Sequence, residues 1–171
     1  MDSDFLLIQK MKKGDKQAIN DFVTKYYNKI LKYCHLHICD YGYAEDITQE
    51  TFQHFFQTLP DYQHYGKAVN YLYVIAANRW KDYYKKKKDI LMEELPEQAE
   101  NSIEKLEEWI EVRRALETLP DELRETAILF FFQGMKQKEI SKILGIGLPL
   151  VKYRVRRIKE LLVSYFGMEV R

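Results

Sequence analysis

The chain has 171 residues and carries 27 Lys and Arg against 26 Asp and Glu, a formal net charge of +1. With 46% hydrophobic and 31% charged residues but only 7 Gly and 4 Pro, its composition is typical of a soluble, helix-rich globular protein. The near-neutral total lacks the basic excess of many nucleic-acid binders. The longest apolar run, residues 127–132, is too short to span a membrane, and the acidic start shows no secretory signal. We therefore expect a cytoplasmic protein.

The near-neutral total conceals three segments of different charge. Residues 1–88 hold 14 basic and 10 acidic side chains, residues 89–111 hold one basic and nine acidic, and residues 112–171 hold 12 basic and seven acidic. The middle segment also contains Pro96 and few apolar residues. The pattern predicts an all-α protein with two small helical domains, 1–88 and 112–171, joined by an acidic linker at 89–111. A single solvated, charged helix is the alternative for that segment.

Helical spacing organises the first domain. A short helix near residues 5–8 should stop at Gly14, and Asp15 can cap a long helix that reaches about residue 38. A third helix is expected from about residue 43 to 58. Opposite its apolar side lies a polar strip that includes Asp46, Gln49, Glu50 and Gln53. Amphipathicity alone favours plain solvent exposure of this strip over a docking surface.

A loop over residues 59–67, rich in aromatic and hydrogen-bonding side chains, precedes a fourth helix at about 68–87 that ends in a lysine run. Aromatic rings stack on unpaired bases, and lysines replace the counterions of a phosphate backbone. A core role for the rings with a solvated helix end explains the same composition equally well. Composition therefore leaves nucleic-acid binding open here.

The second domain contains a helix-turn-helix pattern. A helix at 122–133, expected to be buried through residues that include Phe130 and Phe131, leads to a short helix at 136–144 and a turn at Gly145. The last helix opens with Pro149 near its first turn. Basic and aromatic residues lie on or beside its outward face: Lys152, Tyr153, Arg154, Arg156, Arg157 and Lys159. This arrangement is typical of a major-groove reader, with a plain helical hairpin as the alternative.

Two blocks of motifs resemble extracytoplasmic-function (ECF) sigma factors of bacterial RNA polymerase. The first is Ala44-Glu45-Asp46-Ile47-Thr48-Gln49-Glu50-Thr51-Phe52 together with the run at residues 70–79. The second is Leu116-Glu117-Thr118-Leu119-Pro120, followed by residues 138–146 and 151–154. The resemblance implies a transcription initiation factor that acts with core RNA polymerase and promoter DNA and is restrained by an anti-sigma factor. It implies no cofactor, metal or catalytic residue, and it makes residues 1–88 sigma domain two and residues 112–171 sigma domain four.

The resemblance also implies roles for individual residues. The polar strip, read above as solvent exposed, would instead dock on core polymerase through Asp46, Gln49, Glu50 and Gln53. Capture of the melted −10 element would fall to Tyr62, Gln63, His64, Tyr65, Lys67, Tyr71, Asn78, Arg79 and Lys81. Reading of the −35 element would fall to Lys152, Tyr153, Arg154, Arg156, Arg157 and Lys159. The chain departs from the family pattern at Tyr71, where tryptophan is usual, and at Gly147, where a small polar cap is usual.

Three other interpretations compete with this one: a metal site, an enzyme and a stand-alone DNA-binding regulator. Cys34, His35, His37 and Cys39 have spacings that can seat Zn²⁺, but no second ligand group follows, and a core-plus-surface role explains the helix. An enzyme is disfavoured, because the acidic residues near His54 lack the paired motifs of a di-iron bundle. A stand-alone operator-binding regulator that uses only the last helix-turn-helix is the alternative to a sigma factor.

Overall fold

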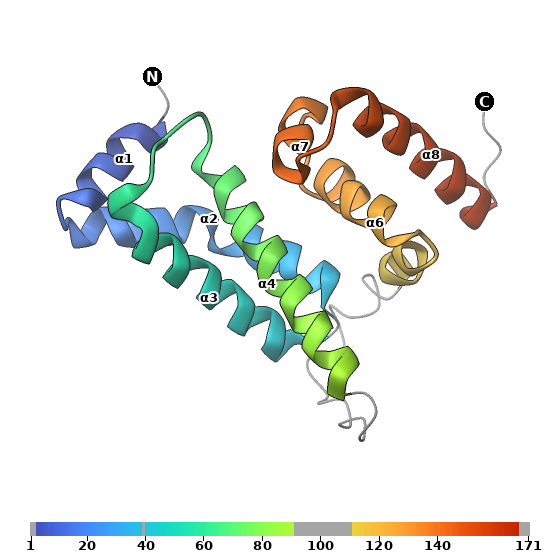
Figure 1. Ribbon diagram of the computed structural model, residues 1–171, viewed down its shortest axis with the longest axis horizontal. Coiled ribbons are helices and arrows are strands. Elements are labelled where there is room, and N and C mark those ends of the chain that lie inside the picture. The colour runs from blue at the N-terminus through green and yellow to red at the C-terminus, as the bar shows by residue number, and fades with distance from the viewer. Residues whose placement is uncertain (1–2, 39, 91–110, 168–171) are drawn as a thin grey trace. The chain divides into compact units, whose positions relative to one another are not determined.

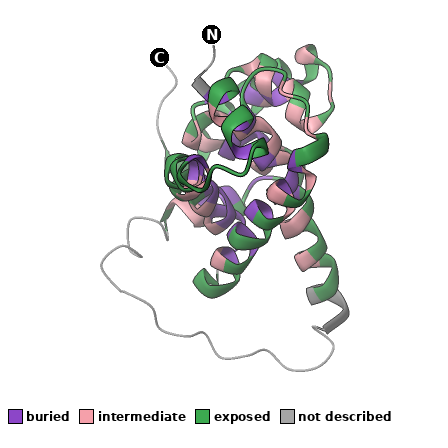
Figure 2. Cartoon of the chain, turned by 90° about the vertical axis from the view of Figure 1, so that its left-hand side faces the viewer, coloured by how far each residue is buried: buried purple, intermediate pink, exposed green. Residues whose placement is uncertain are grey.

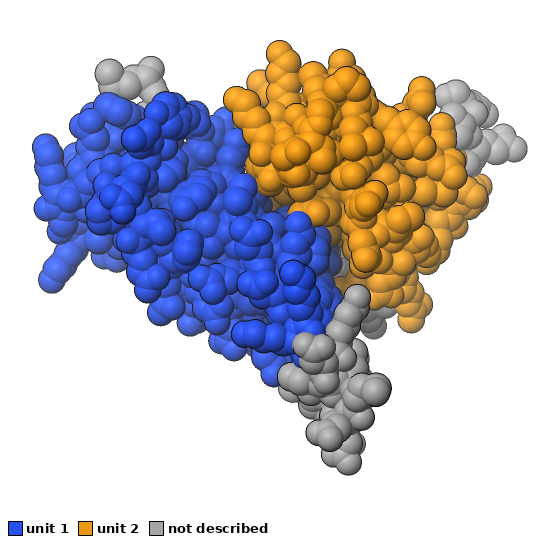
Figure 3. All heavy atoms as spheres, in the orientation of Figure 1, with its two compact units in different colours: residues 1–99 blue, residues 100–171 orange. Residues whose placement is uncertain are grey.

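The computed structural model describes residues 3–38, 40–90 and 111–167, with no side-chain description at 3 and 87–90. The chain forms two compact units, residues 1–99 and 100–171 (Figure 3). The described residues are mainly helical and contain no strand, which confirms the all-α prediction (Figure 1). Most of the expected linker at 89–111 lies outside the described residues, so its bounds stay a prediction. Among the described helices, none combines the length and apolar character needed to cross a membrane.

The described part of unit 1 contains the α-helices α1 (Ser3–Lys12), α2 (Lys16–His37), α3 (Tyr41–Thr58) and α4 (Ala68–Ile90). The carboxylate of Asp15 caps α2 as expected, accepting hydrogen bonds from the amides of Gln17 and Ala18 at 3.0 and 3.2 Å. Asp40 does the same for α3 through the amide of Tyr43 at 3.2 Å, so α3 begins two residues earlier than periodicity alone predicts. Helix α1 is likewise longer than the short helix expected near residues 5–8.

Aromatic side chains fill the core of unit 1. Phe22 of α2 stacks on Phe55 of α3, with ring centroids 4.8 Å apart, and both rings are fully buried. Leu72 of α4 and Tyr33 of α2 are fully buried as well. Figure 2 shows buried stretches in purple that alternate with exposed stretches in green along the helices. Burial of one stripe per helix fixes which side chains of α3 and α4 remain on the outside.

Unit 2 contains a helical segment at 111–117, α6 (Asp121–Ala127), a π-helical stretch (Ile128–Phe132), α7 (Gln137–Leu144) and α8 (Leu148–Phe166). Arg124 fixes the entry into α6. Its guanidinium donates to the backbone oxygens of Leu116 at 2.9 Å and Leu119 at 3.1 Å, which ties the start of α6 to the turn before it.

The π-helical stretch corrects one sequence prediction. Phe130 and Phe131 were expected to be buried, but Phe130 is half-buried and Phe131 is 40% exposed, whereas Leu129 is fully buried. The amide of Gln133 donates to the oxygen of Ile128 at 3.1 Å, five residues back instead of four. The wider turn changes the direction of each following side chain relative to an α-helix. As a result Ile128 and Leu129 face the core, and Phe131 faces solvent.

The helix-turn-helix forms as expected. Helix α7 ends at Gly145, whose φ of +64° lies in the left-handed region that glycine adopts at low cost. Helix α8 then buries Val151, Val155 and Ile158 against the rest of unit 2. The opposite side of α8 therefore remains in solvent.

Candidate nucleic-acid interface

The polar strip of α3 is a continuous exposed face. Its members are all exposed to solvent: Asp46, Gln49, Glu50 and Gln53. The buried side of the same helix includes Thr48 and Thr51, whose hydroxyls donate to the backbone oxygens of Ala44 and Ile47 at 2.7 Å each. These local bonds satisfy both hydroxyls, so the helix can bury them and leave its other face outward.

The loop between α3 and α4 begins with Tyr62, which packs inward against a tyrosine of α4. Tyr62 stacks on Tyr71 of α4, with centroids 5.3 Å apart and planes at 23°, and both contact the ring of Phe55. Both tyrosines are half-buried. The Tyr62 hydroxyl also lies 3.1 Å from Nδ1 of His64. Tyr62, His64 and Tyr71 thus form the floor of the loop, and one face of each stacked ring is already occupied.

The middle of the loop carries its exposed groups. Tyr65 is 85% exposed, and its hydroxyl donates to Oε1 of Gln63 at 2.6 Å. Gly66 has a φ of +94°, which turns the chain back toward α4 after Tyr65, and Lys67 is exposed. The arrangement offers a free aromatic face, an amide edge and a positive charge within a few residues. These are groups that stack on, hydrogen-bond to and neutralise a single-stranded nucleic acid.

Helix α4 continues this surface. Asn78 and Lys81 are exposed, whereas Arg79 is half-buried against α3. The Arg79 guanidinium lies 3.2 Å from Nδ1 of His54 and 4.0 Å from the carboxylate of Glu50. Arg79 belongs to the residues predicted for the −10 element and Glu50 to the polar strip, so these two predicted sets are in contact through this ion pair.

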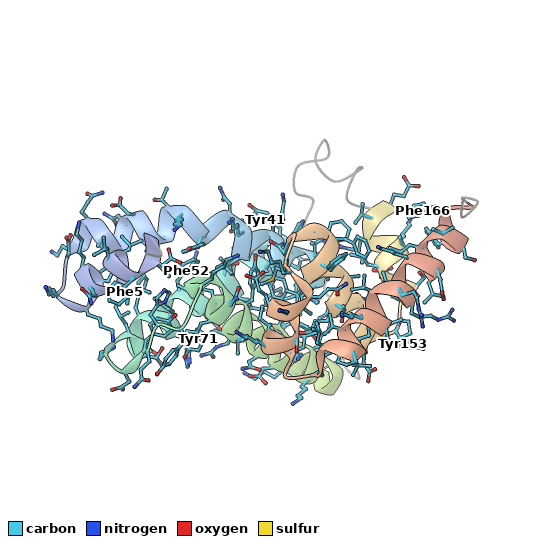
Figure 4. The ribbon with its side chains drawn as sticks, turned by 90° about the horizontal axis from the view of Figure 1, so that it is seen from above. Phe5, Tyr41, Phe52, Tyr71, Tyr153 and Phe166 are labelled. Carbon is cyan, nitrogen blue, oxygen red and sulfur yellow. The ribbon has the colours of Figure 1, made fainter. Side chains whose placement is uncertain are left out.

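The outward face of α8 gathers five of the six residues predicted there, all exposed: Lys152, Tyr153, Arg156, Arg157 and Lys159 (Figure 4, where Tyr153 is labelled). The guanidinium carbon of Arg156 lies 5.9 Å from the centroid of the Tyr153 ring. Arg157 pairs with Glu160 at 3.1 Å.

The sixth residue, Arg154, lies elsewhere. Its side chain is only 13% exposed and reaches Glu122 of α6 at 3.5 Å. It stands three residues after Val151 and four before Ile158, so it shares the face of α8 that packs on unit 2. The structure therefore separates Arg154 from the other five residues.

The described residues of the Cys34–Cys39 cluster are not arranged like the ligands of a metal ion. Cys34 is fully buried, and this burial raises the pKa of its thiol to about 12 although a hydrogen bond with Thr48 opposes the shift. A metal ligand must be a thiolate, which such burial disfavours. His37 stacks on Trp80 at 4.0 Å. Cys39 lies outside the described residues, and the described ones contain no group of three or more His, Cys, Asp or Glu placed to share an ion.

Sequence reasoning overlooked two residues of α1 that touch this surface. Asp4 is 2% exposed and approaches the first amide of α4, and Lys12 donates to the backbone oxygen of Tyr62 at 2.6 Å. These contacts join positions about 50 or more apart in the chain. A charged residue near the amino terminus gave no local signal of such a role.

Comparisons with known proteins assign both units to one family. The family model for sigma-70 region 2 matches residues 22–90, and that for sigma-70 region 4 matches residues 109–162. The ECF RNA polymerase sigma factor SigW of Bacillus subtilis is 30% identical over 175 residues, covering 91% of this chain and 92% of SigW.

Two solved structures share the fold. CnrH, solved in complex with the cytosolic domain of CnrY, superposes with a TM-score of 0.81 at 21% identity, covering 97% of this chain and 98% of CnrH. The sigma factor RpoE, solved with the anti-sigma factor NepR from Bartonella quintana, gives a TM-score of 0.72 at 16% identity, covering 88% and 98%.

Proposed function

The chain belongs to the family of ECF RNA polymerase sigma factors, and we propose that its two units recognise different promoter elements. It is an alternative sigma factor that directs transcription initiation. We assign core-polymerase docking and −10 recognition with melting to residues 1–88, and −35 recognition to residues 112–171, with residues 89–111 as the linker. Sigma factors are not in general enzymes, and no catalytic residue is assigned. Action on core polymerase would place the protein in the cytoplasm.

The observation that supports −35 reading most directly is the exposed face of α8. Helix α8 follows the glycine turn of a helix-turn-helix. Its exposed cations lie in successive helical turns, with Lys152 in one and Arg156, Arg157 and Lys159 further along. Such a helix fits the major groove, where arginine recognises guanine edges and lysine contacts phosphates. We assign this role to Lys152, Tyr153, Arg156, Arg157 and Lys159. Arg154 is left out because it pairs with Glu122.

For the −10 element, the loop at 62–67 supplies the capture site. A base that leaves the duplex can stack on the exposed ring of Tyr65 and hydrogen-bond to the amide of Gln63, while Lys67, Asn78 and Lys81 contact the backbone. Binding the extruded base stabilises the open state against the few kcal/mol that unstacking costs, so melting needs no chemical step. In this proposal Tyr62, His64 and Tyr71 pack beneath the loop and support it. Arg79 of α4, which is held by His54 and Glu50 of α3, also contacts the DNA.

Two protein partners are proposed, core RNA polymerase and an anti-sigma factor. We assign docking on core RNA polymerase to the exposed strip of α3, which offers carboxylates and amides on one uninterrupted face. RpoE of Bartonella quintana was solved with the anti-sigma factor NepR, and we extend an anti-sigma partner to this chain as part of the proposal. An anionic linker at 89–111 suits a basic channel that later holds nucleic acid.

A reconstituted transcription assay tests the assignment. Core RNA polymerase, the purified chain and a library of duplex templates with randomised promoter regions should yield transcripts that share two sequence elements. The double substitution Arg156→Ala and Arg157→Ala should remove the preference at the upstream element and leave core binding intact. Asp46→Ala with Gln49→Ala should weaken core binding instead.

The same assay distinguishes a sigma factor from the alternative, a stand-alone operator-binding regulator. A regulator that used only α7 and α8 would bind duplex DNA tightly without polymerase and would give unit 1 no role. Promoter-selective transcripts that need core enzyme support the proposal. Equal loss of core binding and of upstream preference from each pair of substitutions would overturn the division of roles.

A further inference from the structure

Asp4 is a buried carboxylate whose partners come from two other helices. The side chain is 2% exposed, and Lys25 Nζ and the Tyr26 hydroxyl of α2 donate to it at 2.6 and 2.5 Å. A third donor is the backbone amide of Ala68, 3.4 Å from Oδ2. Burial of a carboxylate is costly unless it is paired and hydrogen-bonded, and these contacts meet that need.

The amide of Ala68 is the first N–H of α4. The first amides of a helix have no partner within the helix, and a side chain just before the helix usually accepts from them. Here the preceding residue is Lys67, whose side chain can only donate. Asp4, 64 residues earlier in the chain, supplies the acceptor, and its negative charge also suits the positive end of the α4 dipole.

The other end of α1 holds the other end of the loop. Lys12 donates from Nζ to the backbone oxygen of Tyr62 at 2.6 Å. Tyr62 directly follows the 3₁₀ turn Leu59–Asp61, and Ala68 directly follows Lys67. The loop at 62–67 is therefore held at both ends by a single helix. Asp4 and Lys12 are eight residues apart on α1, which corresponds to about 12 Å of rigid helix. Figure 1 shows α1 beside this loop.

We propose that α1 is a bracket that fixes the span of the loop at 62–67, and that Asp4 and Lys12 are positioning residues for capture of the extruded −10 base by Gln63 and Tyr65. The inference rests on the proposed role of that loop. The bracket acts before DNA arrives, because a loop already held in its binding conformation loses less entropy on binding. Release of either end should therefore weaken capture of single-stranded DNA without affecting duplex contacts made by α8.

Lys12→Met tests the bracket with little risk to folding, because Lys12 is exposed. Lys10→Met on the same helix is the matched control: Lys10 is also exposed and its loss changes the net charge equally. Hydrogen–deuterium exchange of the free chain should show faster exchange at residues 62–68 in Lys12→Met and unchanged exchange in Lys10→Met. Lys12→Arg, which keeps a donor, should restore slow exchange.

The functional readout uses the chain bound to core polymerase. A fluorescent oligonucleotide, selected by the wild-type holoenzyme from a randomised single-stranded DNA pool, serves as the probe. Its affinity should fall about fivefold in Lys12→Met, the scale of one ordinary hydrogen bond. In Lys10→Met the affinity should stay within twofold of the wild-type value. Asp4→Asn removes the negative charge that faces both Lys25 and the first amide of α4, so it should loosen the α4 end of the loop and also weaken probe binding.

The outcomes separate this inference from the proposed function. Loop exchange and probe affinity that are the same in Lys12→Met and Lys10→Met would overturn the bracket while the wild-type protein still captures the probe. A wild-type holoenzyme that selects no oligonucleotide, although Lys12→Met still loosens the loop, would overturn the capture role instead.

Discussion

The guanidinium of Arg79 on α4 donates a hydrogen bond to Nδ1 of His54 on α3, over 3.2 Å. Arginine can only donate, so Nδ1 of His54 is the acceptor in this pair. The same guanidinium lies 4.0 Å from the carboxylate of Glu50, a member of the exposed strip. A residue proposed to contact the −10 element is thus oriented by the helix proposed to dock on polymerase.

His54→Ala should weaken single-stranded DNA capture by the holoenzyme about two- to fivefold, because Arg79 loses the partner that restricts its rotamers. Core binding should not change. Binding of the selected oligonucleotide by His54→Ala, Arg79→Ala and the double variant gives a double-mutant cycle, and the two effects should be less than additive. Gln57→Ala, an exposed change one turn further along α3, is the control. Tighter binding in His54→Ala would mean that His54 instead restrains Arg79 from the DNA.

The two arginines Arg154 and Arg156 should respond differently to the same substitution. Arg156→Met removes a cation from the exposed face of α8, so affinity of the holoenzyme for a selected duplex fragment should fall and the slope of log affinity against log salt should drop by about one. Arg154→Met removes the partner of Glu122 and should leave that slope unchanged. Titrations at several salt concentrations measure both. A reduced slope in Arg154→Met would place Arg154 at the DNA after all.

The position of Arg154 was predictable from the sequence. Its spacing from Val151 and Ile158 already assigns it to the buried stripe, and a long side chain can reach from that stripe to an acidic partner. The π-helical stretch was not predictable in this way. Residues 127–132 are apolar throughout, so every register buries apolar surface and periodicity carries no information there.

Local signals explain what sequence reasoning placed correctly. Asp15 and Gly145 act through bonds and dihedral angles within a few residues, and the structure shows both in their expected roles. Asp4 and Lys12 act through contacts with residues 64 and 50 positions away. Only the packing of α1 against the rest of unit 1 brings those groups together, so no pattern of neighbouring residues could indicate them.

The same substitution at two glycines of the helix-turn-helix should have opposite effects on stability. Gly145→Ser puts a side chain where φ is +64°, which should destabilise unit 2 by about 1–2 kcal/mol even though nothing lies within 4 Å of the new Cβ. Gly147→Ser puts a capping hydroxyl at the start of α8, where φ is −65° and no side-chain cap is present, and should stabilise by a few tenths of a kcal/mol. Thermal unfolding of the full chain compares them. Equal shifts in Tm would contradict both assignments.

Cys34 should make the stability of unit 1 fall with rising pH. Burial raises the pKa of this thiol from 9.0 to about 12 in the folded chain. Between those values the unfolded chain has lost the proton and the folded chain has kept it. The free energy of unfolding therefore decreases as pH rises, by up to about 1.4 kcal/mol per pH unit, and this contribution is fully present only below pH 9. Burial also raises the pKa of Tyr73 in the same core, so Tyr73 lowers the free energy of unfolding further as pH rises.

Cys34→Ala isolates the thiol from that background. The variant leaves a small cavity that lowers stability at every pH, but it removes the titrating group, so its free energy of unfolding should fall less steeply between pH 9 and 11. Denaturant unfolding at several pH values in this range measures the two slopes. Tyr73 is present in both proteins, and loss of Cys34 also removes a charge that raises the Tyr73 pKa, which flattens the slope of the variant in the same direction. Parallel slopes would show that Cys34 ionises as easily in the folded chain as in the unfolded one. That outcome would reopen a thiolate role for Cys34, which its burial otherwise argues against.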